Sequence, residues 1–281
     1  MREINVQSLI PVVAKLCIEA NYFMGKDLIK RLQEFRARET SPTGREVIDI
    51  LLQNYQLAAE KQMPICQDTG VAVIFAEIGQ ELQLTGGDFY QALNAGVRAG
   101  YSEGFLRKSM VADPVLLRQN TQDNTPAIIH STIVPGDKLK LTVAPKGGGS
   151  ENMSEIKMLK AADGLPGVID FVVDRVRRSG GNPCPPIIVG VGIGGNFEQS
   201  AILAKRALLR DLDQPNPAKQ WQKIENDILE KINALGIGPQ GLGGNTTALA
   251  VQILQQPCHM ASLPVAVNIQ CHAARHKSII I

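Results

Sequence analysis

Glycine is concentrated in a few short segments of this chain rather than spread along it. The sequence of 281 residues has 26 glycines, and clusters of them occupy residues 146–152, 179–186, 187–195 and 236–245. Three of the clusters lie between predicted helices or strands, and the cluster at 187–195 forms the glycine-rich end of a predicted strand. Because a residue without a side chain lets the backbone approach a neighbouring group closely, these clusters also indicate where a site could lie.

Helical periodicity covers most of the first 65 residues. Residues 5–37 are predicted to be helical, and the segment 26–38 places Leu28, Leu32 and Phe35 on one stripe. Thr43 followed by Glu46 is a capping-box pattern, which predicts another helix ending near residues 63–64. The N-terminal part, about 1–65, is therefore expected to be helical.

The remaining residues, about 66–281, mix strands with helices. Runs rich in β-branched residues predict strands at 71–78, 126–134, 138–144, 187–195, 247–254 and 264–271, the second and third joined by a tight turn at 135–137. Helices are predicted at 88–101, 152–162, 166–178 and 217–235, and after the strand at 187–195. Because the two kinds of element do not alternate strictly, we predict an α+β fold in a single domain over 1–281.

The charge balance restricts the partners of the chain. Lys plus Arg is 29 and Asp plus Glu is 27, a net charge of +2, which argues against an extended nucleic-acid surface. A small anionic ligand needs only two or three local cations. No apolar run reaches the roughly 18 residues that a membrane helix requires. The N-terminus has no signal-peptide pattern, so we expect a cytoplasmic protein without a membrane partner.

The five cysteines fall into different settings. An odd count without an export signal argues against a disulfide framework. Cys66, Cys184 and Cys271 lie in or beside loops with stiff or polar neighbours, whereas Cys17 is on an apolar helix face and is predicted to be core. Cys258, beside a histidine, is ambiguous. Spacing alone gives no metal motif, and each cysteine taken singly is more often structural.

Residues 190–195, Gly-Val-Gly-Ile-Gly-Gly, fit the G-x-G-x-x-G pattern of a dinucleotide site between a strand and a helix. Such a site needs an acidic residue at the end of a second strand about 20 residues further on. Here Asp211 and Asp213 lie in a proline-rich loop instead. A turn that packs a helix on a strand is therefore favoured over nucleotide binding.

Two other glycine clusters, 147–152 and 241–247, precede predicted helix starts. Backbone N–H groups at such positions suit a carboxylate or phosphate. The alternative is ordinary capping by Ser150 or Thr246. The sequence does not choose between these readings.

Five motifs occur in order along the chain: CQDTG (66–70), KGGGSENMSEIKML (146–159), NPCPPIIVGVGIGGNFE (182–198), GIGPQGLGGNTTAL (236–249) and CHMASLPVAVNIQCHAARH (258–276). Together they resemble the class I fumarate hydratases, iron–sulfur hydro-lyases related to L-tartrate dehydratase. The resemblance runs nearly end to end and is to the α subunit of the two-subunit form. It implies an enzyme that interconverts fumarate and (S)-malate.

The resemblance also assigns a cofactor and site residues. It implies a [4Fe–4S] cluster held by Cys66, Cys184 and Cys271, with one iron left open as a Lewis acid for the malate hydroxyl. The residues that it implies for substrate binding are Gln67, Asp68, Arg107, Gly147, Gly148, Gly149 and His259, of which Asp68 and His259 are also the candidate catalytic groups.

The residue types suit these roles, and Arg107 and Asp68 also have plainer interpretations. Arg107 can fork onto a carboxylate, although a surface arginine is the commoner case. Asp68 can orient or move a proton, although Q-D-T-G also suits an Asx-turn. His259 can hydrogen-bond a substrate or act as an acid.

The resemblance finally implies a partner. A smaller β subunit is expected to complete the active site in an α2β2-type assembly. The residues after the glycine loop and around the last cysteine favour fumarate over tartrate, with an L-tartrate dehydratase α subunit as the alternative. A nucleotide-binding oxidoreductase and a non-catalytic scaffold chain are the remaining readings.

Overall fold

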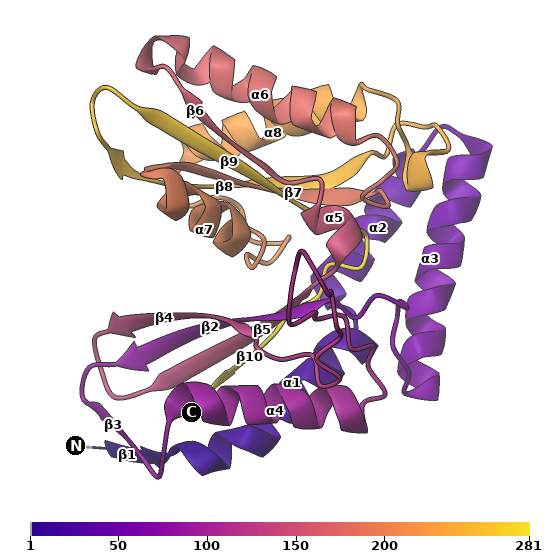
Figure 1. Ribbon diagram of the computed structural model, residues 1–281. Helices are drawn as coiled ribbons and strands as arrows, with labels where there is room; N and C mark the ends of the chain where they lie inside the picture. The colour runs from indigo at the N-terminus through magenta and orange to yellow at the C-terminus, as the bar shows by residue number, and fades with distance from the viewer. Residues whose placement is uncertain (1) are drawn as a thin grey trace. The chain divides into compact units, whose positions relative to one another are not determined.

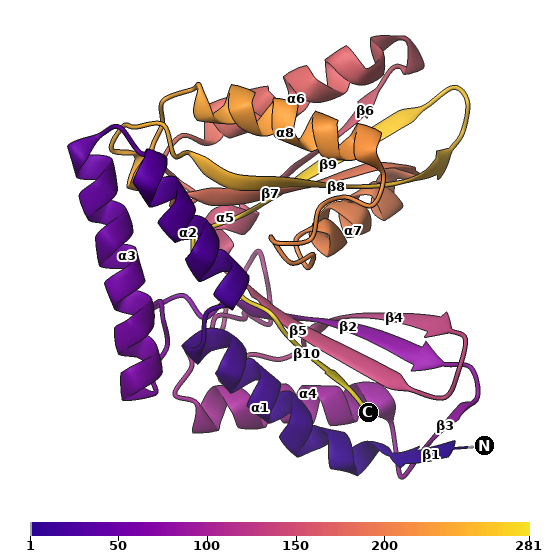
Figure 2. The ribbon, with the colours of Figure 1, turned by 180° about the vertical axis from the view of Figure 1, so that it is seen from behind.

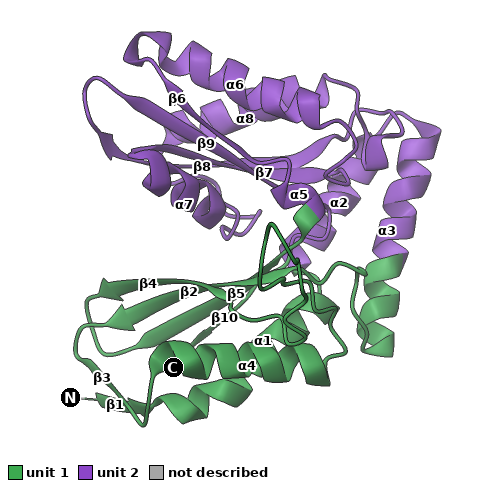
Figure 3. Ribbon diagram, in the orientation of Figure 1, with its two compact units in different colours: residues 1–25, 54–148, 275–281 green, residues 26–53, 149–274 purple. Residues whose placement is uncertain are grey.

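The computed structural model describes residues 2–281 (Figures 1 and 2). The chain divides into two compact units (Figure 3). The first unit comprises residues 1–25, 54–148 and 275–281, and the second comprises residues 26–53 and 149–274. Each has its own sheet and its own hydrophobic core, which confirms the α+β class. The chain passes from the second unit to the first within α3 (Pro42–Lys61).

The first unit is built on a four-stranded sheet in the order β10-β5-β2-β4, with a two-stranded parallel pair, β1 and β3, beside it. Helices α1 and α4 pack side by side on one face of the larger sheet (Figures 1 and 2). The elements are β1 (Arg2–Asn5), η1 (Val6–Ser8), α1 (Leu9–Tyr22), β2 (Val71–Gly79), β3 (Leu82–Thr85), α4 (Phe89–Glu103), β4 (Ile128–Val134), β5 (Leu139–Lys146) and β10 (Lys277–Ile280).

The predicted turn at 135–137 does not make a hairpin. Strand β2 lies between β4 and β5, parallel to β4 with Val73 opposite Ile128 and antiparallel to β5. The segment just after β2 is hydrogen-bonded to the turn, because the amide of Glu81 donates to the carbonyl of Gly136 at 3.0 Å. A tight turn fixes only local geometry, and the pairing was decided by a strand more than 50 residues upstream.

The second unit is built on a sheet in the order β6-β9-β7-β8. Helices α6 and α8 cover one face and α7 covers the other (Figures 1 and 2). The elements are α2 (Lys26–Arg38), α5 (Gly148–Glu151, at the boundary with the first unit), β6 (Glu155–Leu159), η2 (Ala161–Asp163), α6 (Gly164–Ser179), β7 (Ile187–Gly195), α7 (Phe197–Ala207), α8 (Lys219–Asn233), η3 (Pro239–Gly241), β8 (Ala248–Cys258) and β9 (Leu263–Gln270).

The helix predicted at 152–162 is wrong. Residues 155–159 form strand β6, antiparallel to β9 with Glu155 opposite Val267. Ser154 fixes the approach, because its hydroxyl oxygen accepts from the amide of Ile269 at 3.2 Å. So short a segment has no decisive periodicity, and pairing with the exposed edge of β9 sets its conformation.

Local caps account for several helix starts. The Oδ1 of Asp88 accepts from the amide of Gln91 at 2.7 Å and caps α4. The capping box predicted at Thr43 is misplaced by two residues. Ser41 Oγ accepts from the amide of Gly44 at 3.1 Å, and α3 begins at Pro42. Proline suits the first helical position because its φ is already helical and no amide donor is lost there.

Candidate functional site

Buried side chains of the first unit hold the loop at residues 66–70 by hydrogen bonds to its backbone carbonyls. The hydroxyl of Tyr101 lies 3.0 Å from the carbonyl oxygen of Thr69 and 2.9 Å from that of Gly70, and Asn124 Nδ2 donates to the Gly70 carbonyl at 3.2 Å. Tyr101 and Asn124 are fully buried. Gly70 has φ +74°, and a Cβ there would lie 2.6 Å from the backbone of Lys146. Glycine is therefore required at the end of this loop.

Asp68 projects from this loop with both carboxylate oxygens hydrogen-bonded. Oδ1 accepts from the amide of Gly70 at 3.0 Å, which is the Asx-turn that the sequence offered as the plainer reading. Oδ2 accepts from the amide of Gly148 at 2.8 Å. The backbone amide of Asp68 donates to Sγ of Cys66 at 3.4 Å. The carboxylate is thus held in one orientation beside a predicted cluster ligand.

The glycine loop of the first unit consequently serves the protein's own carboxylate. A Cβ at Gly147 would lie 3.0 Å from Asp68 Oδ2, so the absence of a side chain permits the approach. Because the Gly148 amide already donates to Asp68, fewer amides of this loop can donate to a substrate. Gly149 belongs to the second unit. Substrate contact by residues 147–149 stays a prediction.

Arg275 is a buried residue of this site that the sequence analysis did not single out. Its side chain is 4% exposed, and its Nη2 donates to the backbone carbonyl of Asp68 at 2.6 Å. Nη2 also lies 4.0 Å from the position of a Cβ on Gly147. The signal available in the sequence was its place in the CHAARH motif, four residues after Cys271.

Gln67 and Arg107, two predicted substrate ligands, are exposed at the surface of the first unit. Gln67 Oε1 lies 3.3 Å from Sγ of Cys66. The backbone carbonyl of Arg107 accepts from Thr69 Oγ1 at 3.1 Å, which ties its segment to the 66–70 loop. The Arg107 guanidinium forms no ion pair with any residue of 2–281. It is available to an anion.

In the second unit the other two predicted cluster ligands lie on neighbouring segments. The amide of His272 donates to the carbonyl of Cys184 at 3.2 Å, so the backbones at Cys184 and Cys271 are adjacent. Cys184 precedes β7 and Cys271 follows β9, and these two strands pair with Ile188 of β7 opposite Gln270 of β9. Cys184 is exposed and Cys271 is partly buried. The sheet therefore brings together the backbones of two cysteines that are 87 residues apart in the sequence.

His259 is exposed in the connection between β8 and β9. Its Nδ1 accepts a hydrogen bond from the amide of Ala261 at 3.1 Å. In the neutral imidazole the proton is then assigned to Nε2 by this hydrogen bond. The ring is thus arranged to present an N–H donor.

None of the five cysteines forms a disulfide within residues 2–281, and their environments differ. Cys17 is completely buried in the core of the first unit, and burial raises the pKa of its thiol to about 12. It is a core residue, as predicted. Within either unit, no three His, Cys, Asp or Glu side chains of residues 2–281 gather into a metal site. Cys66 belongs to the first unit and Cys184 and Cys271 to the second, so their common ligation stays a prediction.

The second glycine cluster, near residue 245, also serves an internal carboxylate. Glu39, at the end of α2, is fully buried, and its Oε1 accepts from the amides of Asn245 at 3.1 Å and Ser41 at 2.9 Å. A Cβ at Gly244 would lie 2.7 Å from the same oxygen. The segment leads into strand β8, not a helix, so the predicted helix start was wrong. The backbone amides of this cluster were predicted to suit a carboxylate, and the carboxylate that one of them binds is that of Glu39.

The glycines at 190–195 are packing positions. A Cβ on Gly190 would lie 2.2 Å from the carbonyl oxygen of Ala204, and one on Gly192 would lie 2.0 Å from that of Ser200. Both carbonyls belong to α7, which packs against β7. This contact is the helix-on-strand arrangement that the sequence favoured over a dinucleotide site.

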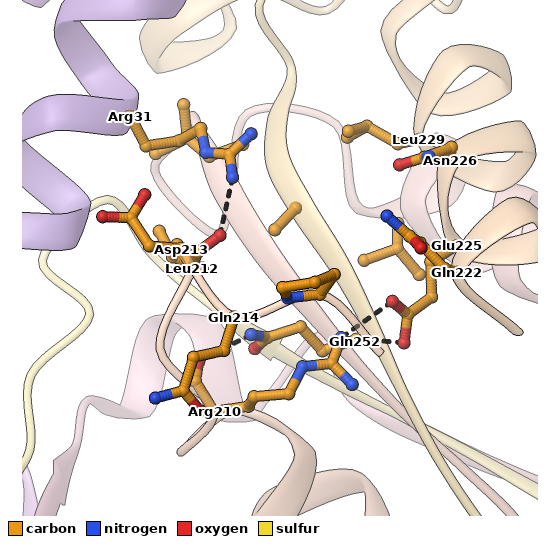
Figure 4. A pocket seen from close by; sticks show the side chains of 14 residues that line it. Arg31, Arg210, Leu212, Asp213, Gln214, Gln222, Glu225, Asn226, Leu229 and Gln252 are labelled. Atoms are coloured by element: carbon orange, nitrogen blue, oxygen red, sulfur yellow. Dashed lines mark hydrogen bonds and ion pairs between the residues drawn. The ribbon is translucent and has the colours of Figure 1, made fainter. Parts of the chain in front are cut away.

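Figure 4 shows a pocket of about 220 Å³ in the second unit, between α2, α8, β8 and the loop after α7. The two arginines that line it donate hydrogen bonds to other residues that line the same pocket. Arg210 Nη2 donates to both oxygens of Glu225 at 2.8 Å, and Arg31 Nη2 donates to the carbonyl of Leu212 at 2.6 Å. None of the predicted site residues lines it. The pocket is therefore separate from the candidate catalytic groups.

The helices within residues 2–281 are all too short or too polar to cross a bilayer.

The sequence of this chain matches a known family and known proteins. The family model described as fumarate hydratase (Fumerase) matches residues 10–280. A Methanocaldococcus jannaschii protein provisionally named L(+)-tartrate dehydratase subunit alpha is 39% identical over 270 residues, covering 94% of each chain. The L(+)-tartrate dehydratase subunit alpha of Escherichia coli K12 is 31% identical over 278 residues, covering 98% of this chain and 91% of the relative. This chain therefore belongs to the fumarate hydratase family of hydro-lyases.

Proposed function

We propose that this chain is the α subunit of a two-subunit iron–sulfur hydro-lyase that reversibly adds water to fumarate, giving (S)-malate. The observation that carries the proposal is the family match across residues 10–280. The five ordered motifs of the sequence support it, because they contain the cysteines and the polar residues that such a reaction needs.

The proposed cofactor is a [4Fe–4S] cluster ligated by Cys66, Cys184 and Cys271. The donor set fits, because none of these cysteines forms a disulfide within residues 2–281, none is fully buried, and the backbones at Cys184 and Cys271 are hydrogen-bonded neighbours. Thiolates are the usual ligands of such clusters. When bound, a cluster with one iron lacking a cysteine supplies a Lewis acid for the departing hydroxyl.

The protein's own groups are proposed to bind the dicarboxylate and handle its protons. The exposed Arg107 guanidinium matches a substrate carboxylate, to which it can donate two parallel hydrogen bonds. Asp68 holds a fixed carboxylate that can accept a proton, and His259 offers an N–H at Nε2. Gln67 and the loop 147–149 would border the same substrate.

The names of the relatives favour a second candidate substrate, L(+)-tartrate. The two reactions differ by one hydroxyl group. Loss of water from (S)-malate gives fumarate, whereas loss of water from tartrate gives the enol of oxaloacetate, which becomes the keto acid. The same cationic and acid–base groups serve both, so the choice depends on a donor or acceptor for the additional hydroxyl.

A smaller β subunit is the proposed partner. The relatives from M. jannaschii and E. coli are both named as subunits alpha, which supports a second chain. A dicarboxylate carries two negative charges, and of the predicted site residues only Arg107 is a cation. We infer that the partner supplies the remaining charge complement, in an assembly of the α2β2 type.

The deciding experiment measures both reactions with and without the partner. The chain is reconstituted anaerobically with iron and sulfide, alone or after co-expression with its β subunit. Fumarate is followed by its ultraviolet absorbance and oxaloacetate by a coupled reduction. We expect malate–fumarate turnover only with the partner. Turnover of tartrate alone would select the second candidate, and turnover of neither would reject the proposed function.

A further inference from the structure

A buried guanidinium lies directly against the candidate catalytic aspartate. Arg275 is 4% exposed, and its Nη2 donates to the backbone carbonyl of Asp68 at 2.6 Å. Its other two nitrogens, Nε and Nη1, are buried without a hydrogen-bond partner among residues 2–281. Arginine stays protonated in proteins, so this burial of a cation with unpaired donors opposes folding. A residue kept only to stabilise the fold would be a poor choice here.

The contact is placed where it controls the direction of the Asp68 carboxylate. Side-chain Oδ1 and Oδ2 of Asp68 are held by the amides of Gly70 and Gly148, and its own amide is held by Cys66. Its carbonyl is the remaining polar group, and Arg275 holds that one. With the guanidinium contact, every polar atom of Asp68 has a defined partner.

The rest of the loop is held in the same way by buried groups. Tyr101 and Asn124 bind the carbonyls of Thr69 and Gly70. These contacts anchor the end of the loop, whereas Arg275 anchors the residue that carries the carboxylate. Arg275 opens the final segment of the first unit, residues 275–281, which continues into β10 beside β5. The guanidinium thus lies two residues before a strand of the sheet.

We propose that Arg275 is a positioning residue for the hydro-lyase reaction, acting through Asp68. The inference rests on the proposed function, in which Asp68 handles a substrate proton. Direct binding of substrate by Arg275 is disfavoured, because Nε and Nη1 have no surface accessible to a ligand. A misplaced carboxylate remains in the site but transfers its proton less efficiently, because a displacement of about 1 Å can cost on the order of 10²-fold in rate.

Hydrogen exchange tests the positioning itself and needs no activity. In Arg275→Ala, the amides of Gly70 and Gly148 should exchange on the order of tenfold faster, because their common acceptor is no longer fixed. Arg2→Ala is the matched control. Arg2 also donates to a backbone carbonyl of the first unit, that of Ile281 at 3.1 Å, but from an exposed position. Unchanged exchange at Gly70 and Gly148 in Arg275→Ala would overturn the proposal.

Kinetics of the reconstituted complex with the β subunit supply the second readout. We expect Arg275→Ala to lower kcat by about 10²-fold, with KM and cluster absorbance near the parental values. Arg275→Lys, which can still donate to the Asp68 carbonyl, should recover part of the loss and covers the case in which the alanine variant fails to fold. A rise in KM alone would assign Arg275 to substrate binding and overturn the positioning role. If the parental complex is inactive the proposed function fails, while the exchange result still stands by itself.

Discussion

The backbone amide of Gly148 donates a hydrogen bond to Oδ2 of Asp68 at 2.8 Å, across 80 residues of sequence. A glycine loop that suits an external anion therefore holds an internal carboxylate. The second glycine cluster does the same for Glu39, through the amide of Asn245. In both places the backbone donors orient a side chain of the protein.

The first prediction concerns the charge of Asp68. Asp68→Asn keeps the shape of the side chain but turns one acceptor into a donor, so either the Gly70 or the Gly148 amide faces an NH2 group. We expect the hydration rate to fall by about 10²-fold or more, because proton transfer and orientation are both lost. Steady-state kinetics of variant and parent proteins with equal cluster content measure this fall in rate. Parental kinetics would remove Asp68 from the catalytic groups.

The second prediction concerns the cluster ligands. Replacing Cys66, Cys184 or Cys271 with serine should abolish the broad visible absorption of the reconstituted protein, because a three-cysteine cluster loses a ligand. Cys258→Ser is the matched exposed control and Cys17→Ser the buried one, and both should retain the absorption. Iron and sulfide analysis measures how much of each element is bound per protein chain. Retained absorption in any of the three ligand variants would remove that cysteine from the set.

The third prediction concerns Arg107. Lysine preserves the charge but cannot form two parallel hydrogen bonds, so Arg107→Lys should raise KM or lower kcat/KM by about tenfold to a hundredfold. The exposed position of Arg107 means that the fold should tolerate the change. Thermal unfolding checks this tolerance. Unaltered kinetics with intact cluster would mark Arg107 as an ordinary surface cation.

The fourth prediction is a pH dependence that arises from Glu39. Burial alone would raise the pKa of this carboxyl, but the neighbouring Thr246 side chain and the nearby amides of Ser41, Asn245 and Thr40 lower the pKa below its ordinary value of 4.5. A lowered pKa in the folded state means that the stabilisation is complete above about pH 4.5 and is lost as pH falls through the folded-state pKa.

Urea unfolding of Glu39→Gln isolates this effect. We expect the variant to lose about 1–3 kcal/mol at pH 7, where the ionised carboxylate accepts its hydrogen bonds. The difference from the parent protein should shrink as the pH is lowered below 4.5. A difference that stays constant over that range would contradict a role for the ionised form.

The fifth prediction tests the packing role of the glycines at residues 190–195. A Cβ on Gly192 would lie 2.0 Å from the carbonyl of Ser200, so Gly192→Ala should destabilise the fold by about 1–3 kcal/mol or more. Gly236→Ala is the control, since it has φ +70° but nothing within 4 Å of the new Cβ. Its cost, measured by urea unfolding, reports strain alone. Equal losses in the two variants would speak against close packing at Gly192.

The sequence by itself determined the elements whose periodicity or caps are local. Residues 26–38 form α2 with Leu28 and Leu32 buried, as the apolar stripe predicts. The strand at 187–195 and the core assignment of Cys17 follow from the same kind of local pattern. The motifs predicted the family, which the match over residues 10–280 confirms. All of these depend on residues close together in the chain.

Tertiary structure decided what depends on partners far apart in the chain. Residues 155–159 are a strand because β9 offers an edge, and β4 and β5 are separated because β2 pairs with both. Arg275 reaches the carbonyl of Asp68 across 207 residues, and Glu39 reaches the amide of Asn245 across 206. Hydrogen-bond donors and acceptors are satisfied by whatever the fold brings near, and no local pattern encodes that neighbour.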